Sequence, residues 1–454
     1  MSTHNHKRAT FSGSLGFILS AASSAIGLGN IWRFPYLAAK YGGGVFLLFY
    51  IILVITFGYT LMMAENAIGR RTRRGPLEAF SKLNKKWAFL GVIAFIIPVI
   101  ILAYYNIIGG WVVRYAVGYI GGLQSEMAQD GFFTSMLSKP GTLILFQVIF
   151  TLATTFIVYN GVEKGIERFS KILMPLLLVL AVIISVYSIS LPGAMEGVKY
   201  FFIPNFEHFS INGVLAAMGQ MFYSLSLAMG IMITYGSYIP DDSDLEKNVS
   251  RIEIFDTAIA ILAGLMIIPA VFAFSGGDQT ALSAGPGLMF ITLPKVFASM
   301  GGTRFIGILF FVLVLFAALT SSVSIMETIV STFCDKFKWS RPKATLATAV
   351  FDFALGIPAV LGYSVLSGVK FGSLDILDSM DFITNSVLMP ITALLTCIFV
   401  GYVIGTGTIK DEVLKSGAFK REAIFNFMIK YAAPIFTVAI LVSSILNTMG
   451  VISL

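Results

Sequence analysis

The feature that most constrains this chain is a series of apolar runs, each long enough to cross a lipid bilayer. A hydrocarbon core about 30 Å thick is crossed by a helix of about 20 apolar residues. By this criterion we expect eleven spans, at residues 11–36, 42–69, 87–120, 141–159, 166–190, 212–239, 251–275, 303–334, 343–360, 376–405 and 425–448. With 57% hydrophobic and 12% charged residues among 454, the composition also indicates an all-α polytopic membrane protein.

The basic residues lie mostly on one side of these spans. Of 31 Lys and Arg residues, five lie in the loops of one side, and 23 lie on the other, in the amino tail and in residues 70–86, 160–171, 240–251, 335–343 and 406–430. Because basic residues favour cytoplasmic loops, we expect the amino end inside and the carboxyl end outside. The cluster Arg70, Arg71, Arg73 and Arg74 follows a span directly, which favours an orientation signal over a nucleic-acid or anionic-lipid site.

Two spans contain residues that disfavour a continuous helix. The first has Gly27 and Gly29 within residues 23–36, and the sixth has Ser226 and Gly230. Unwound backbone persists in a membrane only where protein, water or a ligand pairs it. Helix ends released at mid-membrane present amides to a carboxylate and carbonyls to cations. Glycines can instead allow close helix packing, but two breaks in matching positions favour a small site for a zwitterion and monovalent cations.

The two breaks also indicate internal symmetry. One break opens the first five spans and the other opens the next five, which have the reverse topology. We therefore expect an inverted repeat of residues 11–190 and 212–405, followed by an eleventh helix. Residues 1–10 would form a cytoplasmic tail and inner gate, residues 191–211 an extracellular loop, and residues 406–454 a cytoplasmic loop and the eleventh helix.

The motifs around the breaks resemble those of a known family. GLGNIWRFPY at residues 27–36 and QMFYSLSL at residues 220–227 are similar to the span 1 and span 6 signatures of the neurotransmitter:sodium symporter family, in its bacterial branch of hydrophobic amino acid transporters. Further similar motifs are FAALTSS at residues 316–322, the stretch from Tyr104 to Trp111, and MDF at residues 380–382. The resemblance covers residues 8 to about 405 and implies the leucine-transporter fold with unwound helices 1 and 6.

The resemblance implies two sodium ions, which prefer hard oxygen ligands. The first ion would be bound, together with the substrate carboxylate, by Ala25, Asn30, Ser224 and Asp256. The second ion would be bound by carbonyls and hydroxyls of Ser23, Ile26, Ala317, Thr320 and Ser321. Taken alone, the hydroxyls of residues 320–322 are also typical of ordinary back-bonding within a helix.

Asp256 departs from the family pattern, because many relatives have a neutral asparagine there. A carboxylate inside a membrane needs a cation or hydrogen-bond donors. We expect Asp256 to supply the negative charge that chloride provides in animal members, so that this chain has no chloride requirement. A further hypothesis is that Asp256 takes up a proton on the empty return step.

The resemblance places an amino acid between the two breaks. Its site would be formed by Ala25, Leu28, Gly29, Ile101, Tyr105, Ile108, Tyr223, Ser224, Ser226, Met229, Ser321 and Ile325. Amides near Leu28 and the Tyr105 hydroxyl would hold the carboxylate, and main-chain carbonyls would hold the ammonium. The side-chain pocket has no charged residue, and Met229 is adaptable. We therefore expect apolar or aromatic L-amino acids of the leucine, isoleucine, valine, phenylalanine, tyrosine and tryptophan class.

Charged residues on either side of this site resemble the family's gates. Arg33 and Asp381 would form the outer pair, and Arg8 and Asp335 the inner pair, with Tyr238 supporting the latter. Such weak pairs suit gates, which must open easily.

Four further residues are expected to support the gates and helix breaks. Gln220 is assigned to the gates, and Glu65 is expected to accept hydrogen bonds from the unwound amides of spans 1 and 6. Gly165 and Pro175 lie near the cytoplasmic end of span 5, where they would allow unwinding or a simple kink.

These observations favour a sodium-coupled symporter that works by alternating access in a bacterial cytoplasmic membrane. The expected partners are the amino acid and the lipid bilayer, without nucleic acid; the monomer is the functional unit, and the oligomeric state is left open. An enzyme is not expected, since the sequence shows no metal-ligand cluster, nucleophile with a base, or phosphate loop. Three alternatives are a channel, a transport-silent sensor or accessory protein of the same fold, and a symporter for another small zwitterion or amine.

Overall fold

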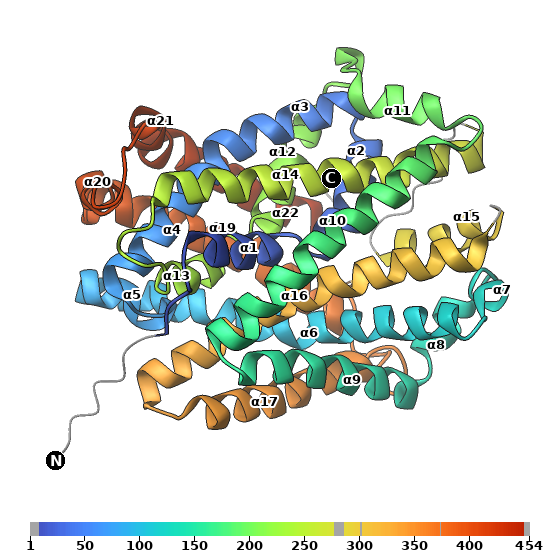
Figure 1. The fold of residues 1–454 in the computed structure, drawn as a ribbon, viewed down its shortest axis with the longest axis horizontal. Coiled ribbons are helices and arrows are strands. Elements are labelled where there is room, and N and C mark those ends of the chain that lie inside the picture. The colour runs from blue at the N-terminus through green and yellow to red at the C-terminus, as the bar shows by residue number, and fades with distance from the viewer. Residues whose placement is uncertain (1–8, 277–285, 300–301, 373, 449–454) are drawn as a thin grey trace.

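The computed structural model describes residues 9–276, 286–299, 302–372 and 374–448. Within these residues the secondary structure is helical, apart from turns and two isolated β-bridges, Gly43 with Pro204 and Phe371 with Leu374. The long helices run roughly along one direction and form an elongated bundle (Figure 1).

The helices follow the predicted order. Those of the first part of the chain are α1 (Ser14–Ala25), α2 (Phe34–Lys40), α3 (Gly44–Leu53), α4 (Tyr59–Thr72), α5 (Pro76–Leu83), α6 (Ala88–Ile120), α7 (Gln124–Met127), α8 (Phe132–Leu137), α9 (Pro140–Tyr159), α10 (Arg168–Ile189) and α11 (Ala194–Phe202). Those of the second part are α12 (Ile211–Ser224), α13 (Ile231–Gly236), α14 (Leu245–Ser275), α15 (Leu293–Ser299), α16 (Thr303–Phe337), α17 (Arg341–Leu361), α18 (Ile376–Asp381), α19 (Met389–Ile398), α20 (Thr406–Leu414), α21 (Glu422–Phe427) and α22 (Ala433–Thr448).

Short helical turns of other types extend or join these helices. The π-helical turns are η1 (Gly29–Arg33), η2 (Val54–Gly58), η4 (Val162–Glu167), η7 (Leu288–Thr292), η8 (Phe382–Leu388), η9 (Phe399–Val403) and η10 (Met428–Ala432). The 3-10 turns are η3 (Lys85–Trp87) and η5 (Phe206–His208).

In the described part of the chain, nine helical stretches are long and apolar enough to cross a membrane, and one bent pair makes ten. The bent pair is the first predicted span. Its halves, Ser14–Ala25 and Gly29–Lys40, meet at 53°. It ends at Lys40, four residues beyond the predicted end at residue 36. The sixth predicted span is present as α12 and α13, which residues 225–230 separate.

The backbone shows why both helices stop. Ile26 ends α1 with φ −80° and ψ 88°, outside the helical region. After α12, Ser226 and Ala228 adopt φ values of 53° and 60°, and Gly230 adopts 76°. Because a right-handed helix requires negative φ values, the stretch cannot continue the helix. A residue with a Cβ is also disfavoured in this left-handed region. Such local strain is typical of functional sites.

Both breaks are enclosed by other helices. The helix α1 packs against α10, α14 and α16, and Figure 1 shows it in the middle of the bundle. The helix α13 packs against α4 and α16. Leu28 and Leu227, which lie in the breaks, are 1% and 0% exposed. The unwound backbone therefore faces protein rather than lipid, as its hydrogen bonding requires.

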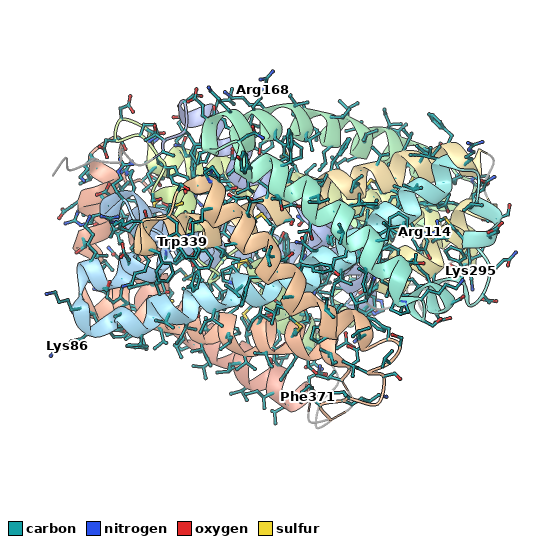
Figure 2. All side chains as sticks on the ribbon, turned by 90° about the horizontal axis from the view of Figure 1, so that it is seen from below. Lys86, Arg114, Arg168, Lys295, Trp339 and Phe371 are labelled. Carbon is teal, nitrogen blue, oxygen red and sulfur yellow. The ribbon has the colours of Figure 1, made fainter. Side chains whose placement is uncertain are left out.

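Short helices gather at the two ends of the bundle. The helices α5, α20 and α21 lie at one end, and α7, α8, α11 and α15 at the other (Figure 1). Figure 2 shows Lys86 at the first end, and Arg114 and Lys295 toward the opposite one. The lysine-rich and arginine-rich residues 70–86 and 406–430 thus lie at the same end of the molecule, as the charge distribution predicts.

One arginine of the predicted orientation signal also has a structural partner. The side chains of Arg70 and Glu412 are both 0% exposed, and Arg70 Nε lies 2.8 Å from Glu412 Oε1. Arg70 Nη1 also donates to the Ser243 carbonyl and the Ser416 hydroxyl, both at 2.9 Å. This pair joins α4 to the α20 region.

We expect Arg70→Met to lower the free energy of unfolding by about 1–3 kcal/mol, because Glu412 Oε1 loses its buried donor while Lys415 Nζ remains 2.7 Å from Oε2. The double variant Arg70→Met, Glu412→Met should recover much of this loss, since both charges are then removed. Thermal unfolding of the purified protein in detergent measures both effects.

Arg74→Met is the matched control. Arg74 is 36% exposed and lies 3.7 Å from Glu78, so its loss should cost less than about 1 kcal/mol. Equal destabilisation by the Arg70 and Arg74 variants would contradict the structural role of Arg70.

Candidate functional site

The two helix breaks border a small cavity. The cavity is lined by Ser24, Ala25, Gly27, Leu28, Gly29, Asn30, Ile101, Tyr105, Tyr223, Ser226, Met229, Ile231, Ser321 and Ile325. It combines main-chain groups from the breaks with mostly apolar side chains from α6, α13 and α16.

Most of the predicted substrate residues line this cavity, and two do not. Ile108 of α6 is 6% exposed and is not among the residues that line the cavity. Ser224 points its hydroxyl to Asp256 Oδ1 at 2.7 Å instead. The lining includes Ser24 and Ile231, which sequence reasoning missed.

Tyr105 reaches the break in the first span from α6. Its hydroxyl oxygen accepts a hydrogen bond from the Leu28 amide at 3.4 Å. A Cβ on Gly27 would lie 3.2 Å from this oxygen and 2.6 Å from Ser321 Oγ, so glycine is required for the close approach. A Cβ on Gly29 would overlap the Tyr223 ring. Amides and a hydroxyl thus converge at one end of the cavity, which suits a carboxylate.

The carboxyl end of α1 contributes acceptors to the same cavity. The last carbonyls of a helix lack amide partners from a following turn. The Ser24 carbonyl accepts hydrogen bonds from the hydroxyls of Ser226 at 3.1 Å and Ser321 at 3.0 Å. These bonds join the break of α1 to the break after α12 and to α16. The neighbouring carbonyl of Ala25 is one of the predicted ligands of both the ammonium and the first sodium.

Asp256 is the centre of a buried polar cluster beside the cavity. Its Oδ1 accepts from Asn30 Nδ2 at 2.8 Å and from the Ser224 hydroxyl, and its Oδ2 accepts from the Tyr50 hydroxyl at 3.0 Å. All three donors are neutral, and Asp256 is 0% exposed. The buried oxygen Asn30 Oδ1 has no hydrogen-bond partner in the part of the chain that the structure describes. A carboxylate beside an open amide oxygen fits a small hard cation such as sodium.

The predicted ligands of the second sodium lie on α1 and α16, which pack together. The Thr320 hydroxyl donates to the carbonyls of Phe316 at 3.1 Å and Ala317 at 3.0 Å, which is the back-bonding geometry. Ser321 crosses to α1 through its bond to Ser24. Ile26 is the first residue after α1.

Ser23, the remaining predicted ligand of the second sodium, is held by its side chain. Its hydroxyl donates to the Ser20 carbonyl at 3.0 Å and lies 2.9 Å from the Ser170 hydroxyl of α10. The Ser23 hydroxyl is therefore bonded within the protein, and the predicted ligand is the Ser23 main-chain carbonyl.

Two side chains hold the breaks in place. Glu65 of α4 accepts a hydrogen bond from the Ala228 amide at 2.8 Å, whereas no bond from the amides of the first break to Glu65 is present among the described residues. Gln220 Nε2 donates to the Gly29 carbonyl at 3.0 Å and so ties α12 to η1.

The two predicted residues of span 5 lie in a π-helical turn and in the α-helix that follows it. Gly165 lies in η4, where a Cβ would overlap the Ile157 carbonyl oxygen, and Pro175 lies inside α10. The helix continues through both residues, so the structure shows a π-helical turn at this end of the span rather than an unwound segment.

The predicted outer gate is not closed by an ion pair. Arg33 and Asp381 border a second cavity, and no ion pair within 4.0 Å joins them among the described residues. The Arg33 guanidinium lies 5.7 Å from the centre of the Tyr223 ring, and Asp381 accepts from Asn385 at 2.5 Å. Because Tyr223 borders both cavities, its ring separates the site from the outer one.

The opposite side of the site is packed. Arg8 lies outside the described residues, and Asp335 accepts from the Gly75 amide at 3.0 Å. The Tyr238 hydroxyl donates to Glu327 at 2.6 Å, and Glu327 forms an ion pair with Arg341.

Sequence reasoning missed this Glu327–Arg341 pair and also missed Tyr50. An acidic residue within span 8 was the available signal for Glu327. Nothing in the sequence marks Tyr50, whose role comes from its place beside Asp256.

Comparison with known proteins identifies the family. A sequence model of the sodium:neurotransmitter symporter family matches residues 8–128 and 124–451. The uncharacterized sodium-dependent transporter YhdH of Bacillus subtilis is 36% identical over 449 residues, which are 97% of each chain. The uncharacterized sodium-dependent transporter MJ1319 of Methanocaldococcus jannaschii is 33% identical over 450 residues, which cover 96% of this chain and 90% of that one.

A solved structure agrees with these sequence matches. The crystal structure of MhsT in complex with L-phenylalanine has a TM-score of 0.87 at 38% identity, and the match covers 96% of this chain and 100% of that chain. The family resemblance seen in residues 27–36 and 220–227 is therefore confirmed. With its two broken helices meeting at a buried cavity, the chain belongs to the sodium:neurotransmitter symporter family.

Proposed function

We propose that this chain is a sodium-coupled symporter that imports apolar and aromatic L-amino acids. The observation that carries this proposal is the cavity between the breaks, where released main-chain groups lie beside an apolar wall. A zwitterion with an apolar side chain matches both parts of such a site. The crystal structure of a relative, MhsT, holds L-phenylalanine, which supports an amino acid of this class.

Each part of the substrate has a complementary surface. The carboxylate is bound by the amides around Leu28 and by the Tyr105 hydroxyl, and the ammonium by carbonyls at the end of α1. The side chain lies against Ile101, Met229 and Ile325, which together present no charge. Because an apolar wall separates substrates by only about 1–3 kcal/mol per methylene, the transporter accepts several apolar amino acids.

Two sodium ions couple this binding to the sodium gradient. The first lies between Asp256 and Asn30 and also contacts the substrate carboxylate, so substrate and ion bind together. The second lies between α1 and α16, at the Ser23 and Ile26 carbonyls and the Thr320 hydroxyl. The Asp256 carboxylate supplies the charge that chloride would otherwise provide, which makes transport independent of chloride.

Alternating access follows from the arrangement of gates. On the side of Arg33 and Asp381 the gate residues are apart, and on the side of Tyr238 and Glu327 they are bonded. Binding of sodium and substrate draws the first side closed as the broken helices rock against α6, α9, α16 and α17. Opening of the second side then releases substrate and sodium to the cytoplasm.

The topology of the proposed transporter is eleven spans with the amino end inside. Residues 11–190 and 212–405 form two inverted five-helix repeats, each opened by a broken helix. Residues 406–454 add a cytoplasmic loop and an eleventh span. The packing of α20 and α21 at the same end as α5 supports this orientation.

Sodium-driven uptake by the purified protein in liposomes tests the function. We expect an inward sodium gradient to drive accumulation of labelled leucine or phenylalanine. Unlabelled apolar and aromatic amino acids should compete, whereas aspartate and lysine should not. Binding without accumulation would point to a sensor, and competition by amines or betaines alone would point to another substrate class.

Tyr105→Phe should weaken amino acid binding by about 10-fold to 100-fold, because it removes a hydrogen bond to a charged carboxylate, worth about 1.5–3 kcal/mol. Tyr115→Phe is the matched control on the same helix, since its hydroxyl donates to the Phe290 carbonyl at 2.7 Å, outside the cavity lining. Equilibrium binding at saturating sodium measures both variants. An unchanged affinity in Tyr105→Phe would remove this residue from the site.

Asp256→Asn should weaken sodium activation by about tenfold or more, which corresponds to about 1.4 kcal/mol, since it removes the carboxylate of the cluster. Wild-type uptake should be equal in chloride and in gluconate, and chloride should stimulate the variant. Asp241→Asn is the control, since this side chain is 76% exposed. Loss of wild-type uptake in chloride-free buffer would refute the role of Asp256.

A further inference from the structure

A second buried carboxyl group lies in the bundle outside the proposed transport site. Asp352 of α17 is 2% exposed and faces α6 and α9. Its Oδ2 accepts from Asn106 Nδ2 at 2.7 Å and from the Thr151 hydroxyl at 3.4 Å. Figure 1 shows α6, α9 and α17 side by side along one edge of the bundle.

The donors around Asp352 are neutral. Among the described residues no Lys, Arg or His forms an ion pair with this carboxyl group. An ionised carboxylate inside a membrane protein is costly without a cation or several donors. One of its two oxygens, Oδ1, has no hydrogen-bond partner in the described part of the chain. The surroundings therefore favour the neutral acid.

Charged groups of the neighbouring elements lie near the ends of α17. Glu327 of α16 is paired with Arg341 at the start of α17. That start is eleven residues, or about 16 Å of helix, before Asp352. Asp375 and Asp378, at the start of α18, interact with Tyr363, which lies beyond the other end of α17. The groups that α6 and α9 present to Asp352 are amides and hydroxyls.

The packing around Asp352 is close. A Cβ on Gly110 of α6 would lie 2.7 Å from the Gln147 amide nitrogen of α9, and a Cβ on Gly356 of α17 would lie 2.5 Å from Gln147 Nε2. Glycines at these positions let the three helices approach each other. A hydrated metal ion needs space and several open oxygens, whereas a proton needs one open oxygen.

Gln147 supplies an acceptor that a proton on Asp352 could use. It is 0% exposed, and neither its Oε1 nor its Nε2 has a partner among the described residues. It lies one helical turn before Thr151 on α9, and it contacts Gly356, one turn after Asp352 on α17. Gln147 and Asp352 therefore occupy the same seam between the two helices.

A hydrogen-bond chain runs from Asp352 to residues next in sequence to two that line the cavity, Tyr105 and Ser321. The Ser322 hydroxyl donates to Asn106 Oδ1 at 2.6 Å, and Asn106 in turn donates to Asp352. Asn106 follows Tyr105 in the sequence, and Ser322 follows Ser321. The chain thus occupies the back of the same two helices that line the cavity.

We propose that Asp352 is a proton-binding site that holds its proton at neutral pH and is coupled through Asn106 and Ser322 to the occupancy of the cavity. The protonated carboxyl group packs between α6, α9 and α17 without a net charge. Its ionisation at alkaline pH places an unpaired charge there and weakens binding in the cavity. This inference goes beyond the proposed transport of amino acids and does not depend on which one is carried.

Infrared spectroscopy of the full chain in liposomes tests the proton directly. At neutral pH the wild type should show a C=O stretching band of a protonated aspartic acid, identified by carboxyl-labelled aspartate, and Asp352→Asn should lose it. Glu163→Gln, at an exposed position, is the control that should retain it. Loss of a carboxylate band in Asp352→Asn, with all protonated bands kept, would overturn the proposal.

Two further measurements cover coupling and folding. Addition of sodium and amino acid should shift the frequency of the assigned band. The pH at which binding is lost on the alkaline side should rise by about one pH unit or more in Asp352→Asn. If that variant does not fold, Thr151→Val should shift the band in an otherwise intact protein. A band that responds neither to ligand nor to Thr151→Val would overturn the assignment. The infrared band can be measured even if amino acid transport fails.

Discussion

The structure depends on one constraint, namely that main-chain groups released inside a bilayer must find partners in the protein or in what it binds. Side chains satisfy part of this requirement at the two breaks. Glu65 accepts a hydrogen bond from the Ala228 amide, and Gln220 donates one to the Gly29 carbonyl. In the proposed function, ligands complete the hydrogen bonding of the groups that face the cavity. The proposed binding site therefore coincides with the helix breaks.

The same constraint couples ligand binding to the position of the helices. The Ser24 carbonyl at the end of α1 already binds hydroxyls from both Ser226 and Ser321. In the proposed cycle, ions and substrate add contacts between these elements, and a ligand shifts a conformational equilibrium only through such differential contacts. Arg33 and Asp381 form no ion pair among the described residues. The proposed mechanism therefore assigns the free energy of outer closure to the bound ligands.

The sequence predicts the parts of this protein that local rules and short motifs determine. Glycines and serines indicated both breaks, and the family motifs contain most of the residues that line the cavity. The structure was needed for contacts between distant helices, such as Tyr50 with Asp256, because no spacing or periodicity encodes such pairs. The sequence could not show that Arg33 and Asp381 stand apart, since the distance depends on the conformation. Ile108 was assigned to the lining by motif, although its side chain packs within the bundle.

The proposed sodium site and the proposed proton site each contain an aspartate–asparagine pair. In both pairs the asparagine amide donates to the carboxylate: Asn30 to Asp256, and Asn106 to Asp352. The carbonyl oxygen of Asn30 is open beside the cavity, whereas that of Asn106 is occupied by the Ser322 hydroxyl. In the first pair the open oxygen is that of the asparagine, and Asn30 lines the cavity together with the end of α1. In the second pair the open oxygen is Asp352 Oδ1, and one open oxygen is sufficient for a proton. In the two proposals, the partner of the asparagine oxygen therefore distinguishes the sodium site from the proton site.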